Sequence, residues 1–526
     1  MSAEWEHVIV GAGSAGAVVA ARLAVRGHRV LLVEAGVDQP VDREVVNPLR
    51  DGTRLILEGF NWDYQANLRG RVREHATVGA GVARSRALWG RFPYRLGKVV
   101  GGSSAVNGAV AMRALPGDFA DWVAMGNPEW SWDRVLPFYK MVERDTDFPG
   151  GDHGVRGPIP IRRPRRDQLH ELDLAFWDEC RRMGVPDLAD LNAGVDVGVG
   201  AVPANTVGTE RVDTASGYLA PVRDLPNLEI RTGCRVTRLL LDGQRVTGVE
   251  LVQDNRTVRV TARNVVLSAG AIGSPAILLR SGIGPADTCA DLGVTPVVDL
   301  PGVGENLVDH PSVVIWAKPR DGLCTPGIPW RQVAARVSSD GRAADLQVWL
   351  LNNVQTSTIP GFVNRLGWPM VVGISVMLLR PASRGRVLLP DADPGTSPVI
   401  ELGFGSVDDD VDRLAHGVRT AWRILRSERF AERLTEVQLW NDAMVADDTV
   451  LRSAVRNVMS PGWHAIGSAR MGPASDPMSV VDQRCRVHGV RDLRVVDASV
   501  FPTMPSAPTN LTTIMLAEKI ASGLGE

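Results

Sequence analysis

A glycine turn near the N-terminus constrains the fold of this chain more than any other feature. Residues 8–16 read V-I-V-G-A-G-S-A-G, which is a short apolar strand, a glycine turn and the start of a helix. An alanine- and valine-rich stretch follows up to Gly27, and a second apolar run, 30–33, ends at Glu34. This order predicts one complete βαβ unit whose turn presents backbone N–H groups to a pyrophosphate.

Two further features indicate which dinucleotide this unit binds. Glu34 lies 18 residues after Gly16, where a carboxylate accepts hydrogen bonds from an adenosine ribose and disfavours a 2′-phosphate. Residues 497–518 begin D-A-S-V-F-P and contain T-N-L-T-T-I-M-L-A-E, and we expect them to complete the same site from the other end of the chain. A dinucleotide enclosed in this way is not passed between enzymes, which favours a tightly held FAD over NAD or NADP.

Length, charge and cysteine content narrow the class of protein. A chain of 526 residues exceeds what one core usually holds, so two domains are expected. Lys plus Arg total 58 against 60 for Asp plus Glu, so the chain has no excess positive charge that would attract polyanions. We therefore predict no nucleic-acid partner. The five cysteines never form C-x-x-C, so the sequence indicates no metal site and no disulfide framework. A reducing cytoplasm is the expected location.

No segment reads as a leader or a membrane span. Residues 1–6 lead directly into the first strand, so a cleaved secretion signal is not expected. The most apolar later window, 370–379, is about half of the roughly 20 residues that cross a bilayer, and it predicts a buried strand.

The chain as a whole predicts an α/β protein with two interleaved domains. A Rossmann-like FAD-binding domain is expected from residues 1–155, 206–312 and 456–526, and a substrate domain from residues 156–205 and 313–455. The composition shift after residue 313, to alternating apolar strands rich in Trp and Pro, predicts an antiparallel sheet covered by helices.

Three local patterns refine this division. Residues 189–207 are small and predict a long loop, whereas residues 228–260 predict short strands with a hairpin at Asp242-Gly243. The run of three aspartates at 408–410 resembles a metal site, but it directly precedes an amphipathic stretch, 411–425. Acids are favoured at a helix N-terminus, so capping is the preferred interpretation.

Five ordered motifs resemble those of the glucose-methanol-choline (GMC) oxidoreductases. Residues 97–107, G-K-V-V-G-G-S-S-A-V-N, resemble the first family signature, and residues 270–284, G-A-I-G-S-P-A-I-L-L-R-S-G-I-G, resemble the second. The segment P-G-V-G-E-N-L followed by D-H-P, at 301–311, and the closing D-A-S-V-F-P also match. The resemblance covers essentially the whole chain. It is strongest to bacterial choline, aryl-alcohol and hydroxymethylfurfural oxidases and dehydrogenases.

The resemblance implies that FAD oxidises a small primary alcohol, aromatic alcohols included, to an aldehyde, with electrons passing to O₂, a quinone or another acceptor. Some relatives tether the flavin through a histidine just before the motif asparagine. That place is Val106 here, which implies non-covalent FAD. The implied cofactor residues are Gly11, Gly13, Ser14, Ala15, Gly16, Glu34, Ala35, Gly101, Gly102, Ser103, Asn107, Gly108, Ala109, Val236, Ala269, Gly270, Asp497, Ala498, Asn510, Leu511 and Thr512.

Alcohol oxidation needs a base beside the hydroxyl, because the α-carbon donates hydride only as the O–H proton leaves. A neutral imidazole suits this role. From its surroundings alone, His464 reads more readily as a buried structural histidine than as a base. The resemblance identifies it as the catalytic histidine and places the hydride on flavin N5. The partner position of the family falls on Asn510, whose amide could hold the substrate oxygen.

The other histidines are expected to have supporting roles. His310, in the D-H-P turn, is interpreted as structural or as supporting the site. The remaining seven are expected to be structural or exposed: His7, His28, His75, His153, His170, His416 and His488.

Several alternatives stay open at this stage. Trp463 either walls the pocket for flat substrates or only packs. Pro508 departs from the family pattern and removes a backbone donor near the flavin. Oxidase and dehydrogenase activity are not distinguished by these motifs. Two rival functions are a non-redox FAD-containing lyase that cleaves cyanohydrins and a flavin-holding binding protein without turnover.

Overall fold

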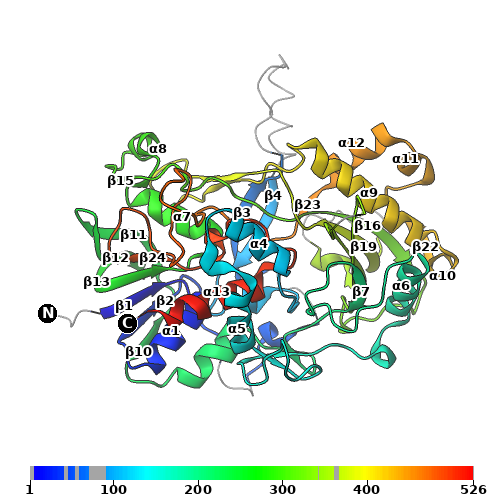
Figure 1. Ribbon diagram of the computed structural model, residues 1–526, viewed down its shortest axis with the longest axis horizontal. Coiled ribbons are helices and arrows are strands. Elements are labelled where there is room, and N and C mark those ends of the chain that lie inside the picture. The colour runs from blue at the N-terminus through cyan, green and yellow to red at the C-terminus, as the bar shows by residue number, and fades with distance from the viewer. Residues whose placement is uncertain are drawn as a thin grey trace, which may run out of the picture.

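The computed structural model describes residues 5–40, 45–53, 58–69, 91–341, 343–359 and 367–524. His75 lies outside these ranges. Two large sheets stand side by side, and both chain ends lie next to the first of them, on the left in Figure 1. Among the described residues, no helix combines the length and the apolar composition that crossing a bilayer requires.

The first large sheet is built on parallel strands, as the glycine turn predicts. Its parallel pairs run in the order β10 (Leu228–Arg231), β2 (Val30–Val33), β1 (Trp5–Val10), β13 (Arg256–Leu267) and β24 (Leu493–Val495). Helix α1 (Gly16–Val25) connects β1 to β2, and the C-terminal helix α13 (Thr509–Ser522) packs against α1. The predicted βαβ unit is therefore confirmed, and the Rossmann-like fold class with it.

Strand β13 belongs to two pairings at once. Residues 262–267 pair in parallel with β1, whereas residues 256–261 pair antiparallel with β12 (Arg245–Gln253), which pairs with β11 (Arg235–Asp242). Gly243 has φ +55° in the turn between β11 and β12, a conformation that favours glycine. The hairpin predicted at Asp242-Gly243 is confirmed.

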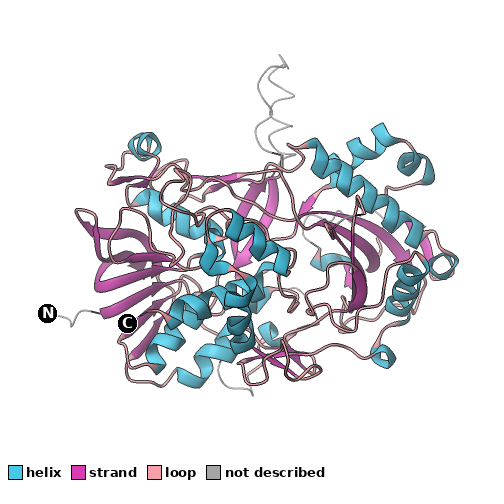
Figure 2. Ribbon diagram, in the orientation of Figure 1, coloured by secondary structure: helices cyan, strands magenta, loops and turns pink. Residues whose placement is uncertain are grey.

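The second large sheet is antiparallel throughout. Its strands run in the order β22 (Leu434–Val437), β16 (Pro311–Pro319), β19 (Met370–Leu378), β18 (Leu346–Gln355), β17 (Val333–Val337) and β7 (Gly198–Ala201), and β23 (Ser460–Pro461) pairs with the start of β16. Helices α6 (Glu171–Arg182) and α9 (Asp408–Leu425) cover its outer face (Figure 2).

The alternation of side chains along these strands gives the sheet two apolar faces. In β19, Val372, Ile374 and Val376 lie in the core beneath the helices, while Ser375 and Met377 face the opposite side and line a cavity. Successive side chains of a strand point to opposite faces, and β19 is largely apolar along its whole length, so it is buried on both sides. The inner face of this sheet is therefore available to form the wall of a site.

The smaller elements complete the fold. A four-stranded sheet has the order β20 (Arg386–Leu388), β21 (Val399–Glu401), β3 (Asn61–Asn67) and β4 (Arg91–Gly97). Short pairs are β5 (Glu143–Asp145) with β6 (Ile159–Ile161), β8 (Thr206–Val207) with β9 (Glu210–Arg211) and β14 (Ile283–Gly284) with β15 (Val298–Asp299). Further helices are α3 (Ser103–Val106), α4 (Pro116–Ala124), α5 (Trp132–Val142), α7 (Gly270–Arg280), α8 (Ala286–Asp291), α10 (Glu428–Ala431), α11 (Asp442–Ala446) and α12 (Asp448–Val458).

The interpretation of residues 189–207 as one long loop is wrong in part, because β7 lies within it. A Cβ on Gly198 would meet Leu188 Cγ at 2.3 Å, and one on Gly200 would meet the Leu188 carbonyl oxygen at 2.7 Å. Because residue 188 approaches so closely, the strand requires glycine at these positions. The glycines interrupt the alternation of apolar side chains that would otherwise predict a strand. Strand β7 brings the 156–205 segment to the edge of the second sheet; the five-segment domain division stays a prediction.

The aspartate run at 408–410 forms the first turn of α9, as its position before an amphipathic stretch predicts. Asp410 is buried, and its carboxylate accepts hydrogen bonds from the N–H groups of Ala382 and Ser383, both at 2.8 Å. The aspartate therefore joins the helix to the end of the second sheet.

A buried ionic network anchors the segment after α5. Glu143, Asp145 and His153 lie close enough together to surround an ion. Arg113 pairs with Glu143, and Arg163 Nη1 lies 2.9 Å from Asp145 Oδ2, so two guanidinium groups already supply the positive charge. Hydrogen bonds to Asp145 and neighbouring carboxylates raise the pKa of His153 to about 10. His153 is thus structural, as expected for it, and buried.

Candidate active site

A cavity of about 1130 Å³ lies between the parallel strands of the first sheet and the inner face of the second. Backbone from the glycine turn and the 97–108 loop lines one part. Eight aromatic side chains also line the cavity: Trp62, Tyr64, Phe92, Trp316, Trp330, Trp349, Trp440 and Trp463. The cavity therefore has one region suited to a polar, backbone-bound group and another suited to a flat apolar molecule.

The glycine turn is shaped by close backbone contacts. Gly11 has φ +96°, and a Cβ there would lie 2.5 Å from the Ser268 carbonyl oxygen. A Cβ on Gly16 would lie 1.9 Å from the Gly11 carbonyl oxygen. Both positions therefore exclude any side chain, and the turn brings its backbone N–H groups to the start of α1, where anions are stabilised.

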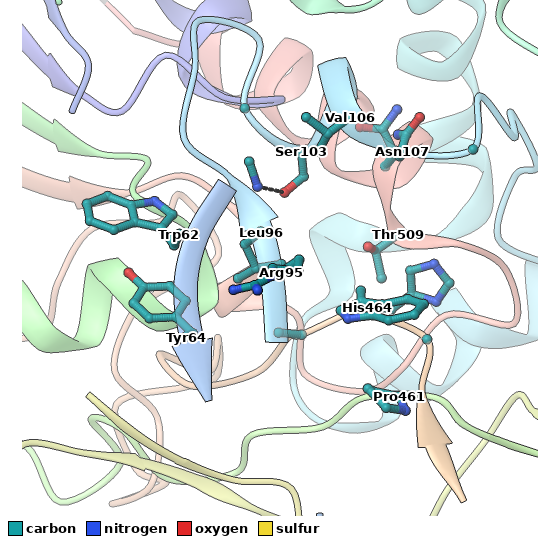
Figure 3. Close-up of a pocket in the computed structure, with 18 of the residues that line it drawn as sticks. Trp62, Tyr64, Arg95, Leu96, Ser103, Val106, Asn107, Pro461, His464 and Thr509 are labelled. Atoms are coloured by element: carbon teal, nitrogen blue, oxygen red, sulfur yellow. Dashed lines mark hydrogen bonds between the residues drawn. The ribbon is translucent and has the colours of Figure 1, made fainter. Parts of the chain in front are cut away.

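A second glycine loop packs directly on the first. Gly102 has φ +52°, and a Cβ there would lie 2.6 Å from Gly13 Cα. The hydroxyl of Ser103 accepts a hydrogen bond from the Gly97 N–H at 3.1 Å, the dashed contact in Figure 3. The loop thus holds Asn107 and Gly108 on the cavity wall opposite the second sheet.

The two ends of the chain meet at this cavity. The Ser14 hydroxyl, in the glycine turn, donates a hydrogen bond to Asn510 Oδ1 at 2.8 Å. Eight residues further along each segment, about two helical turns, Arg22 Nε donates to the buried Glu518 Oε2 at 2.8 Å. Helices α1 and α13 therefore form one unit, and the C-terminal segment closes the site that the N-terminal turn begins.

Two histidines form a dyad on the substrate side of the cavity. His310 Nδ1 and His464 Nδ1 lie 2.9 Å apart, and the two rings are perpendicular. His310 is buried, and its Nε2 lies 3.2 Å from the Leu379 carbonyl oxygen and 3.1 Å from that of Pro505. Carbonyl oxygens only accept, so His310 Nε2 carries a proton and its Nδ1 is the acceptor in the neutral ring.

This arrangement selects the tautomer of His464. Its Nδ1 must carry the proton that it donates to His310 Nδ1, which leaves Nε2 with a free lone pair. His464 lines the cavity and is half-buried. Figure 3 shows His464 and Thr509 directed toward the same part of the cavity, with Val106 and Asn107 above them in the view. An unprotonated imidazole nitrogen is thus available to a bound molecule.

The loop before His464 is built to allow this contact. A Cβ on Gly462 would lie 2.9 Å from His464 Nδ1 and 3.2 Å from His310 Cβ, so only glycine leaves room for the two rings. Trp463 has φ +57°, a left-handed conformation that costs a non-glycine residue about 1–2 kcal/mol. The buried Asp309 holds the loop by accepting the His464 backbone N–H at 2.9 Å.

Burial, His310 and the guanidinium of Arg331 hold the pKa of His464 well below its ordinary value. Burial likewise lowers the pKa of His310 to about 4. Both rings are therefore neutral near pH 7, which is the state that the Nδ1–Nδ1 hydrogen bond requires.

Two family models described as GMC oxidoreductase match the chain, one over residues 5–312 and the other over residues 381–517. The chain belongs to the GMC oxidoreductase family. It is 37% identical to 5-(hydroxymethyl)furfural oxidase of Methylovorus sp. (strain MP688), over 99% of this chain and 98% of the relative. It is 31% identical to oxygen-dependent choline dehydrogenase of Vibrio vulnificus (strain YJ016), over 99% and 94%.

A solved structure supports the same assignment. Pyridoxine 4-oxidase from Mesorbium loti superposes with a TM-score of 0.87 at 29% sequence identity, and the match covers 99% of each chain. GMC oxidoreductases bind FAD. The family, the oxidoreductase class and the FAD cofactor expected from the motifs are therefore confirmed for this chain.

The residues of this GMC oxidoreductase fit a dinucleotide. The N–H groups of Ala12 and Gly36 donate to Glu34 at 2.9 and 2.8 Å, which leaves further lone pairs of this carboxylate on the cavity wall for a ribose. Asp497 accepts the Gly270 N–H at 2.9 Å and the Ser274 hydroxyl at 2.6 Å, so it joins the C-terminal segment to the start of α7.

Most of the predicted cofactor residues line the cavity. Those on its wall are Gly11, Gly13, Ser14, Ala15, Glu34, Ala35, Gly102, Ser103, Asn107, Gly108, Val236, Ala269, Gly270, Asp497, Ala498 and Asn510. Those off its wall are Gly16, Gly101, Ala109, Leu511 and Thr512. The Thr512 hydroxyl is instead buried against the Tyr139 hydroxyl at 2.7 Å, and Thr513 takes the cavity-facing position on α13. One residue along a helix turns a side chain by about 100°, which a motif does not resolve.

The structure separates the surroundings of the two predicted catalytic residues. His464 and Asn510 both line the cavity. The side-chain oxygen of Asn510, Oδ1, accepts a hydrogen bond from Ser14 in the glycine turn, whereas the His464 ring is hydrogen-bonded to His310. Thr509, which the motifs did not single out, lines the cavity and faces the same region as His464 (Figure 3).

Proposed function

We propose that this GMC oxidoreductase oxidises a primary alcohol, including aromatic alcohols, to an aldehyde, with His464 Nε2 as the base that takes the hydroxyl proton. The supporting observation is the contact between His310 Nδ1 and His464 Nδ1, because it leaves the cavity-facing nitrogen unprotonated. FAD-dependent alcohol oxidation as a class follows from the family. The base and the substrate are the parts that we propose.

The protein groups carry out the proton chemistry in a fixed order. An alcohol hydroxyl next to His464 donates its hydrogen bond to Nε2, and the proton moves there as the α C–H bond breaks. His464 Nδ1 keeps its own proton throughout, because His310 accepts it. When bound, FAD supplies the acceptor for the hydride that leaves the α-carbon.

Two features support a flat primary alcohol as substrate. Eight aromatic side chains, named above, line the cavity, and aromatic rings pack favourably against a flat aromatic molecule. The relatives named as oxidases of hydroxymethylfurfural and pyridoxine act on molecules with an aromatic ring. We further propose that FAD is held non-covalently, because Val106 offers no atom for a tether, and that O₂ or another acceptor reoxidises it.

The group that holds the substrate oxygen is either Asn510 or Thr509. Ser14 engages Asn510 Oδ1 and thereby leaves the Asn510 amide N–H groups as donors. Thr509 offers a hydroxyl on the same cavity wall. The role of Asn510 as the second catalytic residue stays a prediction, and Thr509 is its competitor.

Substitution separates these two donors. We expect Asn510→Ala to slow anaerobic flavin reduction about 10²-fold if its amide stabilises the developing alkoxide. Thr509→Val, which keeps the side-chain shape, would then change the rate less than about threefold. The reverse order of effects assigns the oxygen to Thr509. The measurement is the rate of flavin bleaching by a saturating alcohol, with flavin content checked in each variant, since Asn510 also contacts the glycine turn.

An anaerobic spectroscopic experiment tests the proposed function. The yellow holoprotein is mixed with aromatic, aliphatic and amino alcohols, and air is then admitted. Bleaching by aromatic primary alcohols, followed by recovery of the yellow colour in air, is the result that we expect of an oxidase. Bleaching without recovery indicates a dehydrogenase that needs a quinone or another acceptor. A spectrum that no alcohol changes, with cyanohydrin cleavage instead, would establish the lyase alternative and reject oxidation.

A further inference from the structure

One cation in the substrate part of the cavity is not used by the proposed reaction. Arg331 precedes β17 and lines the cavity together with Trp330 and Trp349. Its guanidinium carbon lies 4.3 Å from the ring centroid of Trp330 and 4.4 Å from that of Trp349. Two indole rings therefore lie against this guanidinium, whose N–H donors all lie in the plane of the group.

No carboxylate among the described residues pairs with this guanidinium. No acidic residue of that part of the chain acts on the Arg331 pKa, and Arg331 Nε is buried without a hydrogen-bond partner. Burial alone lowers the pKa of Arg331 to about 9, and no acidic neighbour raises it. Arg336, within β17, differs because the charges of Asp118, Asp196 and Asp190 partly offset the lowering of its pKa by burial. Arg331 thus remains a cation near pH 7 with its donors unmatched.

The charge of Arg331 is close enough to the proposed base, His464, to affect its pKa. Arg331 is among the groups that hold the pKa of His464 below its ordinary value, so its charge acts on the dyad through the cavity. A desolvated cation without a partner is costly, and an anion that enters with a ligand removes that cost. A carboxylate matches the planar fork of a guanidinium with two parallel hydrogen bonds.

We propose that Arg331 binds the carboxylate of an aromatic alcohol substrate, so that the ring lies along the tryptophan wall while the hydroxymethyl group reaches His464. This inference rests on the proposed function for the reacting end of the molecule. It adds the chemical class at the other end: hydroxymethyl-substituted aromatic acids, bound as anions.

Binding to the wild-type holoprotein provides the first test, and it needs no variant. Benzoate and benzamide have the same shape and differ in charge, and each is titrated while the flavin absorption spectrum is followed. We expect benzoate to bind at least about tenfold more tightly than benzamide, as a charge-assisted, bidentate contact implies. Equal dissociation constants for the two ligands would overturn the proposal.

Substitution of Arg331 provides the second test. Arg331→Gln should remove the preference for benzoate and lower kcat/KM for 4-(hydroxymethyl)benzoate by about 10- to 100-fold relative to 4-(hydroxymethyl)benzamide. Arg331→Lys, which keeps the charge without the fork, should give an intermediate ratio. Arg320→Gln is the matched control, because it removes the same charge from an exposed position outside the cavity. A ratio unchanged in Arg331→Gln contradicts the assignment.

The two proposals fail in different ways. If alcohols bleach the flavin with equal kcat/KM for the charged and neutral pair, the carboxylate site is wrong and alcohol oxidation stands. If no alcohol bleaches the flavin but benzoate binding still depends on Arg331, the oxidation proposal is wrong and the anion site stands.

Discussion

Replacing His464 with alanine is expected to slow anaerobic flavin reduction by about 10² to 10⁴, the range for a lost general base, without loss of flavin. The physical reason is that His464 Nε2 is the lone pair that the dyad presents to the cavity, whereas the cofactor cradle is formed by glycine turns and carboxylates far along the chain. Rapid mixing with a saturating alcohol measures the reduction rate, and the absorbance of the released flavin measures occupancy. Unchanged reduction in a flavin-replete variant rejects the assignment.

The same residue sets the pH dependence. Burial first, then His310 and Arg331, lower the pKa of His464 well below its ordinary value of 6.5. The base is therefore unprotonated down to pH values below 6.5, and the wild-type reduction rate should stay level there and fall only in more acidic solution. A loss of rate centred above pH 6.5 argues against His464 as the titrating base.

The pH profile of flavin reduction needs a control for Asp309, a carboxyl group beside His464. Burial raises the pKa of Asp309 to about 7, and Asp309 accepts both the His464 backbone N–H and the Tyr94 hydroxyl. The profile is therefore repeated with Asp309→Asn. A change in rate near pH 7 that disappears in this variant belongs to the carboxyl group and not to the dyad.

Replacing His310 with leucine is expected to lower the reduction rate about 10²-fold, although His310 does not line the cavity. Leucine removes the acceptor that holds the proton on His464 Nδ1, so the ring is free to carry this proton on Nε2, where it prevents Nε2 from acting as a base. Loss of the correct tautomer costs a serine protease about 10⁴-fold where the acceptor is a carboxylate. A smaller effect is expected here because the acceptor is a neutral imidazole.

A conservative variant separates this positioning role from a packing role. His310→Asn places a carbonyl oxygen close to the position of Nδ1, so it should restore much of the rate that leucine loses. The ¹⁵N chemical shifts of His464 report directly which ring nitrogen is protonated. Equal rates for the leucine and asparagine variants, or a wild-type His464 protonated on Nε2, would show that the dyad does not select the tautomer.

The sequence predicts the cofactor half of the site well because its determinants are local. The glycine turn, the strand at 30–33 and the hairpin at Asp242-Gly243 each depend on φ values or side-chain alternation within a few residues, and all three are confirmed. Backbone geometry of this kind can be predicted from the sequence because it requires glycine at particular positions.

The substrate half was less predictable, because its contacts join distant segments. His310 and His464 are 154 residues apart, and neither local stretch shows that their rings meet. Arg331 contacts two tryptophans, one of them 18 residues later on the next strand. Strand β7 is not predicted for a related reason. The residues that pack against it leave room only for glycine, and glycines do not show the alternation of apolar side chains that indicates a strand. For the proposed anion site, the available sequence signal is an arginine, Arg331, next to a tryptophan and without acidic residues close by in the chain.

The bond between Ser14 and Asn510 has a consequence for the order of events during synthesis. Its partners are separated by 496 residues, so at typical translation rates of about 5–20 residues per second the glycine turn waits about 25 to 100 s for α13. During that interval the glycine turn lacks its contact with Asn510. The cofactor site therefore reaches its final form only when α13 docks on the glycine turn.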